Sequence, residues 1–227
     1  MHETGVIGSN GLIGTEIVKF FNPSLTFNSS NIHTLKNYKF SKLIIAAPSG
    51  NRRYAEQFPD NDLLNIKNLI KELSSTQADT VVLISSIDTI LYNNTHYGSN
   101  RKLLEDFIKK KFSNRHVLRL CTLIATTIKK NVLYDLKHQQ FLDSINPESE
   151  LQWYPLDNLQ KDIEHVIANG ITEITLVSEP IKNKEIIDRF FPEYSVGIAK
   201  STAQCYNITP TYFSKEEIFA KMSEYLA

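Results

Sequence analysis

The chain has 227 residues, of which 41% are hydrophobic and 22% are charged, the balance of an ordinary globular protein. Lys plus Arg and Asp plus Glu both number 25, so no basic surplus points to nucleic acid or an anionic membrane as a partner. The two cysteines are isolated, the six histidines are scattered, and neither a membrane-spanning apolar run nor a signal peptide is recognisable, which together predict a cytoplasmic protein without a disulfide scaffold or a metal site.

Short apolar runs suited to buried strands alternate with longer stretches of helical periodicity. The run "TVVLISS" at 80–86 is β-branched and uninterrupted, which is typical of a central strand in a parallel sheet. In chain order we expect strands at 5–8, 24–32 (the candidate second strand), 42–47, 80–86, 116–124 and 173–178, and helices over about 13–21, 62–73 and 97–111, with another helical stretch before residue 173. This alternation predicts an α/β fold with a Rossmann-like doubly wound parallel sheet.

The later part of the chain is more polar and is interrupted by several prolines. We therefore expect a single domain over 1–227. Its Rossmann core would take about 1–125 plus 160–180, and a small C-terminal substrate lobe would take 126–159 and 181–227.

A glycine-rich segment lies between the first expected strand and the first expected helix. Gly8, Gly11 and Gly14 recur at every third position, a GxxGxxG spacing rather than the more common GxGxxG. Such a turn lets the backbone approach a pyrophosphate, while the start of the helix supplies N–H donors and a positive dipole end. The candidate loop comprises Gly8, Ser9, Asn10, Gly11, Leu12, Ile13 and Gly14; the alternative is a tight turn that binds nothing.

The end of the second strand often carries an acidic residue that binds the adenosine ribose of NAD. Here the segment offers the neutral side chains of Asn28, Ser29 and Ser30 instead. Because no carboxylate would repel a 2′-phosphate, NADP(H) fits as well as NAD(H), with a slight preference for NADP(H). A polar turn capped by asparagine is the alternative.

Ser85 and Ser86 end the strand at 80–86, and "HYGSNRKLLEDF" begins a helix eleven residues later. The glycine turn, this serine pair and the Tyr-Gly helix start resemble the extended short-chain dehydrogenase/reductase family, in particular its NAD-dependent epimerase/dehydratase branch. By this resemblance Ser86 is the catalytic Ser/Thr and Tyr97 the general acid/base. The family pattern is YxxxK, whereas this chain has Arg101 at the last position. Four-residue spacing keeps Tyr97 and Arg101 on one helical face, but a guanidinium is larger than an ammonium and differs from it in shape.

The resemblance also implies that Ala46, Ala47 and Pro48 pass under the coenzyme. Asp88, His96, Arg52 and Trp153 are further candidates for contacting substrate: Asp88 from its place after Ser86, His96 as the neighbour of Tyr97, Arg52 as a phosphate partner and Trp153 as a stacking ring. Each has a structural alternative: a strand end for Ala46–Pro48, a solvated loop for Asp88, His96 and Arg52, and the core for Trp153.

We expect an NAD(P)-dependent oxidoreductase or epimerase that acts on a sugar or nucleotide sugar in polysaccharide biosynthesis. Keto-sugar reduction is preferred, because only one acidic residue, Asp88, follows Ser86, where the family's dehydratases place acidic residues for elimination. Helices 62–73 and 97–111 carry wide apolar faces that would pair in a homodimer or pack on their own sheet. The alternative function, motivated by Arg101, is an NAD(P)-binding sensor or partner-binding protein that never turns over.

Overall fold

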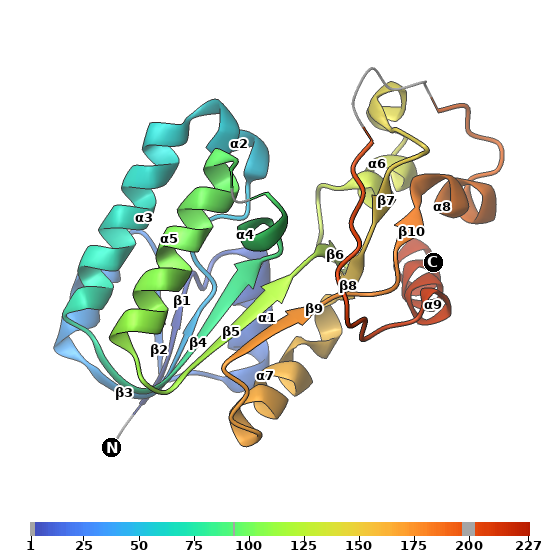
Figure 1. Cartoon of the computed structure of the whole chain (residues 1–227). Helices are drawn as coiled ribbons and strands as arrows, with labels where there is room; N and C mark the ends of the chain where they lie inside the picture. Colours follow the sequence, from blue (N-terminus) through green and yellow to red (C-terminus); the bar gives the residue numbers. More distant parts are fainter. Residues whose placement is uncertain (1–2, 93, 197–202) are drawn as a thin grey trace. The chain divides into compact units, whose positions relative to one another are not determined.

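The computed structural model describes residues 3–92, 94–196 and 203–227, and the chain divides into two compact units (Figure 1). Unit 1 comprises Met1–Arg119 and Asn158–Thr175, and unit 2 comprises Leu120–Asp157 and Leu176–Ala227. All the residues predicted to bind coenzyme or to act in catalysis belong to unit 1.

Unit 1 is built on a six-stranded sheet with the strand order β2-β1-β3-β4-β5-β9. β1 pairs in parallel with both β2 and β3, and β3 pairs in parallel with β4. β2 and β3 therefore lie on opposite sides of β1 within the sheet. The strand order reverses at β1, so its carboxyl end is a topological switch point. The strands are β1 (Glu3–Ile7), β2 (Leu25–Phe27), β3 (Lys39–Ile45), β4 (Gln77–Ser86), β5 (Arg115–Leu120) and β9 (Glu173–Leu176).

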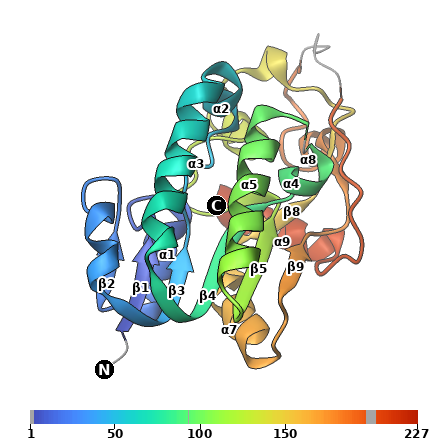
Figure 2. The same cartoon turned by 60° about the vertical axis from the view of Figure 1, so that its left-hand side comes forward.

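Helices cover both faces of this sheet (Figures 1 and 2). α3 and α5 pack against each other on one face, and α1 and α7 pack against each other on the opposite face. The bounds are α1 (Leu12–Phe21), η1 (Ile32–Asn37), α2 (Arg52–Gln57), α3 (Pro59–Ser74), α4 (Asp88–Leu91), α5 (His96–Lys111), η3 (Leu156–Asn158) and α7 (Leu159–Ala168). The predicted fold class, a Rossmann-like doubly wound parallel sheet, is confirmed.

The central strands are apolar without interruption because both of their faces are covered by helices. Leu43, Ile44 and Ile45 of β3 are fully buried, as are Val81 and Val82 of β4. The resulting core holds the carboxyl ends of β1, β3 and β4 in place, and the candidate site lies at these ends.

Several predicted strands differ from the observed ones at their ends. The expected strand 116–124 is two strands: β5 ends at Leu120, and β6 (Thr122–Ile124) pairs with a strand of unit 2. The apolar pattern continues through Cys121, but the chain changes there from one sheet to another. Apolar periodicity predicts a strand without indicating which strand it pairs with. The candidate second strand 24–32 is restricted to Leu25–Phe27, since Asn28 begins a turn. β3 ends at Ile45 rather than at Ala47, and β9 ends at Leu176 rather than at Ser178.

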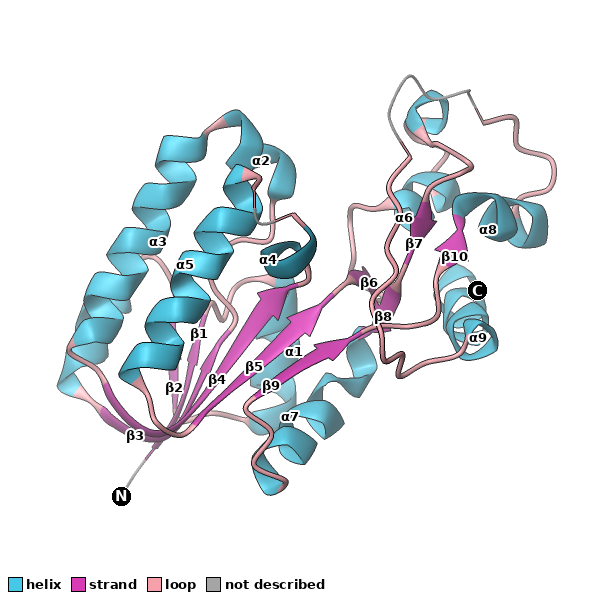
Figure 3. Cartoon of the chain, viewed as in Figure 1, coloured by secondary structure: helices cyan, strands magenta, loops and turns pink. Residues whose placement is uncertain are grey.

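Unit 2 combines two small sheets with helices (Figure 3). β6 pairs in parallel with β8 (Trp153–Pro155), and β7 (Glu150–Leu151) pairs antiparallel with β10 (Ile181–Lys182). Trp153 and Tyr154 are fully buried in this unit, and the buried Gln152 amide donates to the carbonyls of Ser178 and Ile208. The helices are α6 (Val132–Lys137), η2 (Leu142–Ser144), α8 (Asn183–Phe190) and α9 (Lys215–Leu226).

None of the helices in residues 3–92, 94–196 and 203–227 is long and apolar enough to cross a membrane. Across the same residues, no group of three or more His, Cys, Asp or Glu side chains is placed to hold a metal ion.

Candidate active site

The loop after β1 is crowded by backbone on two sides, which explains its glycines. Gly8 has a φ of +86°, and a Cβ there would lie 2.5 Å from the carbonyl oxygen of Ala46. A Cβ on Gly14 would run into the carbonyl oxygen of Gly8, and one on Gly11 would lie 3.3 Å from the same atom. The GxxGxxG spacing therefore matches a turn that folds back on itself between a strand and a helix.

The same loop presents the start of α1 at the switch point of the sheet. The N–H groups of Gly8 and Ser9 both donate to the carbonyl of Phe27, at 2.8 and 3.2 Å, so they are used within the fold. Gly11 precedes α1 and provides no side-chain cap, which leaves the N–H groups of the first turn without a side-chain partner at this cap. Uncapped donors and the positive end of the helix dipole suit a phosphate group, so the residues fit a dinucleotide.

The turn after β2 is organised by its own asparagines. The Asn28 carboxamide oxygen accepts from the backbone N–H of Ser30 at 2.9 Å and from its hydroxyl at 2.6 Å. Asn31 accepts from the backbone of Asn28 at 2.8 Å. Ser29 and Ser30 are exposed, and residues 28–31 include no carboxylate.

The loop after β3 runs from the glycine turn to the tyrosine. At its start, Ala46 donates its N–H to the carbonyl of Ile7 at 2.8 Å, and it lies against Gly8. At its far end, the carbonyl of Ser49 accepts from Arg101 at 2.7 Å, and a Cβ on Gly50 would lie 3.9 Å from the Tyr97 hydroxyl. One short segment thus brings the two halves of the predicted site into the same region of unit 1.

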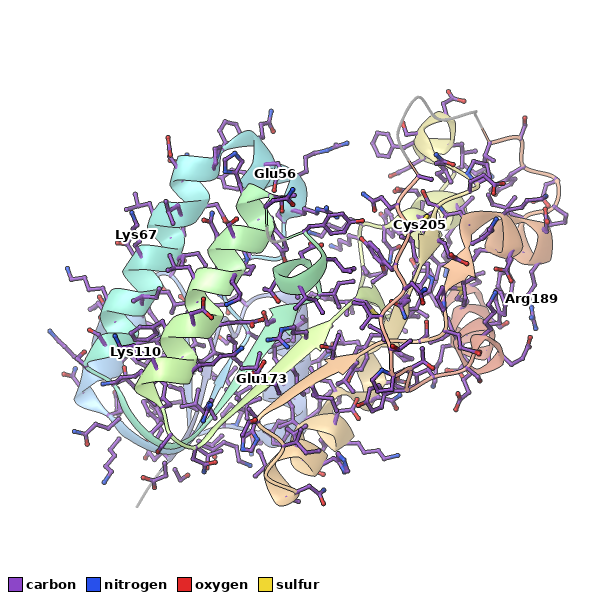
Figure 4. All side chains as sticks on the ribbon, in the orientation of Figure 1. Glu56, Lys67, Lys110, Glu173, Arg189 and Cys205 are labelled. Atoms are coloured by element: carbon purple, nitrogen blue, oxygen red, sulfur yellow. The ribbon has the colours of Figure 1, made fainter. Side chains whose placement is uncertain are left out.

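The start of α5 is held by caps from two other segments. Thr95 accepts from the N–H of Gly98 at 3.1 Å. Glu56 of α2, labelled in Figure 4, accepts from the N–H groups of Tyr97 and His96 at 2.8 and 3.3 Å. A Cβ on Gly98 would lie 2.6 Å from the carbonyl oxygen of Asp88, so α4 and α5 approach each other closely at this residue. These contacts fix the backbone of Tyr97.

Ser86, Tyr97 and Arg101 lie together at the end of β4. Tyr97 is 8% exposed, and the side chains of Ser86 and Arg101 lie close enough to influence the pKa of its hydroxyl. The guanidinium carbon of Arg101 lies 4.2 Å from the centroid of the Tyr97 ring. The Ser86 hydroxyl also accepts from the backbone N–H of Asp88 at 3.2 Å, which orients it.

Burial dominates the protonation of the two acids at this position. Burial raises the pKa of Tyr97 above its usual value; the charge of Arg101 opposes this, and the charge of Asp88 adds to it. Burial likewise raises the pKa of Asp88 against the opposing charge of Arg52 and the hydrogen bond to Ser86. The Oδ1 atom of Asp88 is buried without a hydrogen-bond partner, and the Arg52 guanidinium lies 3.8 Å from it.

The four residues predicted to contact substrate do not all lie at the candidate site. Asp88 lies beside Ser86 and Tyr97. Arg52 lies beside Asp88 and stacks on Tyr92 at 4.6 Å. His96 is exposed in the first turn of α5. Trp153 is fully buried in unit 2, the core placement that the sequence left open as its alternative.

No protein-family model and no curated protein sequence matches this chain. Solved structures do match, at low sequence identity. A double mutant of DesIV, a dTDP-glucose 4,6-dehydratase from Streptomyces venezuelae with NAD bound, aligns with a TM-score of 0.74 and 13% identity, covering 98% of this chain and 96% of that one. The dTDP-4-dehydrorhamnose reductase of Bacillus anthracis in complex with NADP aligns with a TM-score of 0.65 and 14% identity, covering 96% and 86%.

The UDP-glucose 4-epimerase of Thermotoga maritima with UDP-glucose aligns with a TM-score of 0.61 and 10% identity, covering 89% of this chain and 85% of that one. This chain has the fold of the extended short-chain dehydrogenase/reductases. The resemblance predicted from the glycine turn and from the Ser86 and Tyr97 motifs is confirmed at the level of the fold.

Within this short-chain dehydrogenase fold, two acidic residues that bind Arg101 and the start of the Tyr97 helix were not predicted from the sequence. Asp62 of α3 forms a bidentate pair with Arg101, at 2.5 and 3.0 Å, and Glu56 caps the Tyr97 helix. Neither lies in a recognisable motif, and each is about forty residues from its partner. Their only sequence signal is an acidic residue in or near a helical stretch, which is too common to be informative.

Proposed function

We propose that this chain binds NADP(H) or NAD(H) and reduces a keto group of a sugar or nucleotide sugar, in polysaccharide biosynthesis. The observation that carries the proposal is the grouping of Ser86, Tyr97 and Arg101 at the end of β4, joined by the 46–50 loop to the glycine turn. The named neighbours support the substrate class, since they act on dTDP- or UDP-linked sugars.

The dinucleotide would lie across the carboxyl ends of the strands. The glycine turn and the first turn of α1 would hold its pyrophosphate, the 28–30 turn its adenosine ribose, and Ala46–Pro48 the path between them. When bound, the reduced coenzyme supplies a hydride to the carbonyl carbon.

The protein supplies orientation and a proton. Ser86 would donate a hydrogen bond to the substrate carbonyl oxygen, which polarises the carbonyl group. Tyr97 would transfer its phenolic proton to the same oxygen as negative charge develops there. A buried tyrosine with a raised pKa keeps this proton at neutral pH, which favours reduction over the oxidative direction.

One observation favours a second candidate function, coenzyme binding without turnover. The Arg101 guanidinium is already bound by Asp62 and by the Ser49 carbonyl. In the family pattern a lysine at this position contacts the nicotinamide ribose, and a residue so engaged would serve that contact poorly.

The test is NAD(P)H oxidation followed at 340 nm with nucleotide keto-sugars, beginning with dTDP-4-dehydrorhamnose. The wild-type protein should turn over at least one of them, and Tyr97→Phe should lose at least about a hundredfold in kcat while still binding coenzyme. Tyr54→Phe, which removes a hydroxyl from a half-exposed tyrosine on α2, is the matched control and should keep full activity.

Two results would separate the candidates. Coenzyme binding without oxidation across a broad keto-sugar panel would favour the non-catalytic function. Equal activity of wild-type and Tyr97→Phe would remove Tyr97 from the reaction.

A further inference from the structure

The Arg101 side chain is held by three hydrogen bonds to two partners. Its Nη1 donates to Oδ2 of Asp62 at 2.5 Å, and its Nη2 donates to Oδ1 of Asp62 at 3.0 Å and to the carbonyl of Ser49 at 2.7 Å. Asn100 donates to the same Oδ2 atom at 2.8 Å. The side chains of Arg101 and Asp62 are each 6% exposed. A buried bidentate pair of this kind leaves the guanidinium one orientation.

That orientation also determines the position of the Tyr97 ring. The guanidinium carbon of Arg101 lies 4.2 Å from the ring centroid, so the cation covers one face of the phenol. Asp62 comes from α3, whereas Tyr97 and Arg101 both come from α5. The pair therefore ties the neighbouring helix to the tyrosine through Arg101.

Asp62 also changes the charge that Tyr97 experiences. An unpaired Arg101 would stabilise the phenolate, but the Asp62 carboxylate pairs with this guanidinium and opposes its charge. The other charged groups around Tyr97 are Asp88 of α4, Glu56 of α2, which accepts from the Tyr97 N–H, and Arg52 of α2, which lies near Asp88. Three carboxylates thus face two guanidiniums, and this balance favours the neutral phenol.

We propose that Asp62 is a positioning residue for the reduction: by binding Arg101 it holds the Tyr97 ring and cancels the arginine charge, so that Tyr97 remains a proton donor. The inference rests on the proposed function for its catalytic meaning. It also implies that arginine at position 101 works together with Asp62. Arg101→Lys should therefore lower activity, because an ammonium cannot form the bidentate pair that keeps the ring in place.

Direct titration of Tyr97 tests the inference without coenzyme or substrate. Protein labelled with ¹³C at tyrosine Cζ is titrated by NMR from neutral to strongly alkaline pH, with Tyr97→Phe used to assign the resonance. The wild-type Tyr97 should ionise above an ordinary tyrosine. In Asp62→Asn the ionisation should shift down by about one pH unit, since Arg101 then acts on the phenol without compensation. Asp60→Asn makes the same change at an exposed position of α3 and should leave the titration unmoved.

The two proposals can fail separately. An unchanged Tyr97 titration in folded Asp62→Asn would overturn the role of Asp62, whatever the coenzyme result. If Asp62→Asn does not fold, the double variant Asp62→Asn/Arg101→Met removes both charges together. The proposal then predicts a Tyr97 titration that stays high, with a reduced kcat; wild-type kcat in the double variant would overturn it. Absence of coenzyme binding would refute the proposed function alone and leave the titration result standing.

Discussion

Glu105 of α5 and Arg119 of β5 form a buried bidentate ion pair at the end of the strand that carries Ser86. Nη2 of Arg119 lies 2.6 Å from Oε2 of Glu105, and its Nε lies 2.9 Å from Oε1. Ser85 and Thr89 donate to the same carboxylate at 2.7 and 3.0 Å. Arg119 is bound as well by the half-exposed Glu173 of β9 (Figure 4). The Glu105 carboxylate therefore links β4, α4, α5 and β5 beside the candidate site.

Glu105→Gln should destabilise unit 1 strongly, because Arg119 would be left buried with only Glu173 as its charged partner. We expect the free energy of unfolding to fall by roughly 3 kcal/mol, as measured by urea denaturation. Asp106→Asn is the control: it breaks the exposed pair between Lys102 and Asp106 on the same helix and should cost less than about 1 kcal/mol. Similar losses in both variants would show that the buried network contributes no more than a surface pair.

Gly98 has no room for a side chain, because the carbonyl oxygens of Asp88 and Tyr92 both lie against it. Gly98→Ala should push α4 and α5 apart, cost about 1–3 kcal/mol in the free energy of unfolding and lower kcat through the adjacent Tyr97. Gly50→Ala is a matched control, since a Cβ there comes no closer than 3.9 Å to the Tyr97 hydroxyl. Its melting temperature should stay the same or rise slightly. An unchanged melting temperature in Gly98→Ala would contradict the packing described.

The pH dependence of ketone reduction follows from the direction of the Tyr97 shift. Burial raises the pKa of Tyr97 above its usual value, so the phenol keeps its proton and stays neutral through neutral and mildly alkaline pH. We expect kcat/KM to be level up to about pH 10 and to fall only above it. The free energy of unfolding has the same pH dependence. The contribution of the protonated Tyr97 to stability is present below about pH 10 and is lost as the pH rises through the folded-state pKa of Tyr97. A decline centred near pH 8 would mean that another group supplies the proton.

Much of unit 1 could be predicted because its signals are local. The β-branched run of β4 and the glycines at 8, 11 and 14 report burial and backbone crowding, both of which a short stretch of sequence determines. The ends of the strands were predicted less accurately. The apolar pattern of 116–124 runs through two sheets, and only the pairing of Thr122–Ile124 with Trp153–Pro155 separates them.

The candidate site was predicted as a set of residues but not as a network. The spacing of Tyr97 and Arg101 places them on one face of a helix, yet it does not say whether the arginine is free. Asp62 decides this, and its pairing with Arg101 arises from the packing of α3 on α5. Contacts across forty residues depend on tertiary structure, which no motif encodes.

The expected homodimer can be tested on the outer faces of α3 and α5. Leu64 is 55% exposed and Leu103 is 41% exposed, whereas Ile66, Leu69 and Leu104 face the core of unit 1. If these helices pair between two copies, Leu64→Asp combined with Leu103→Asp should convert the dimer to a monomer in sedimentation velocity. Tyr212→Asp, at another exposed apolar residue, should leave the oligomeric state unchanged. A wild-type monomer at all concentrations would contradict the expectation.

Coenzyme binding at the glycine turn is the central claim, and a fluorescence titration with NADPH and NADH tests it most directly. The wild-type protein should bind at least one coenzyme saturably, with NADPH slightly preferred because residues 28–31 carry no carboxylate. Gly11→Asp should abolish binding, and Gly11→Asn, which has the same size without the charge, should weaken it less. Saturable binding lost in Gly11→Asp would establish the turn as a dinucleotide site; no binding of either coenzyme to the wild-type protein would contradict the account.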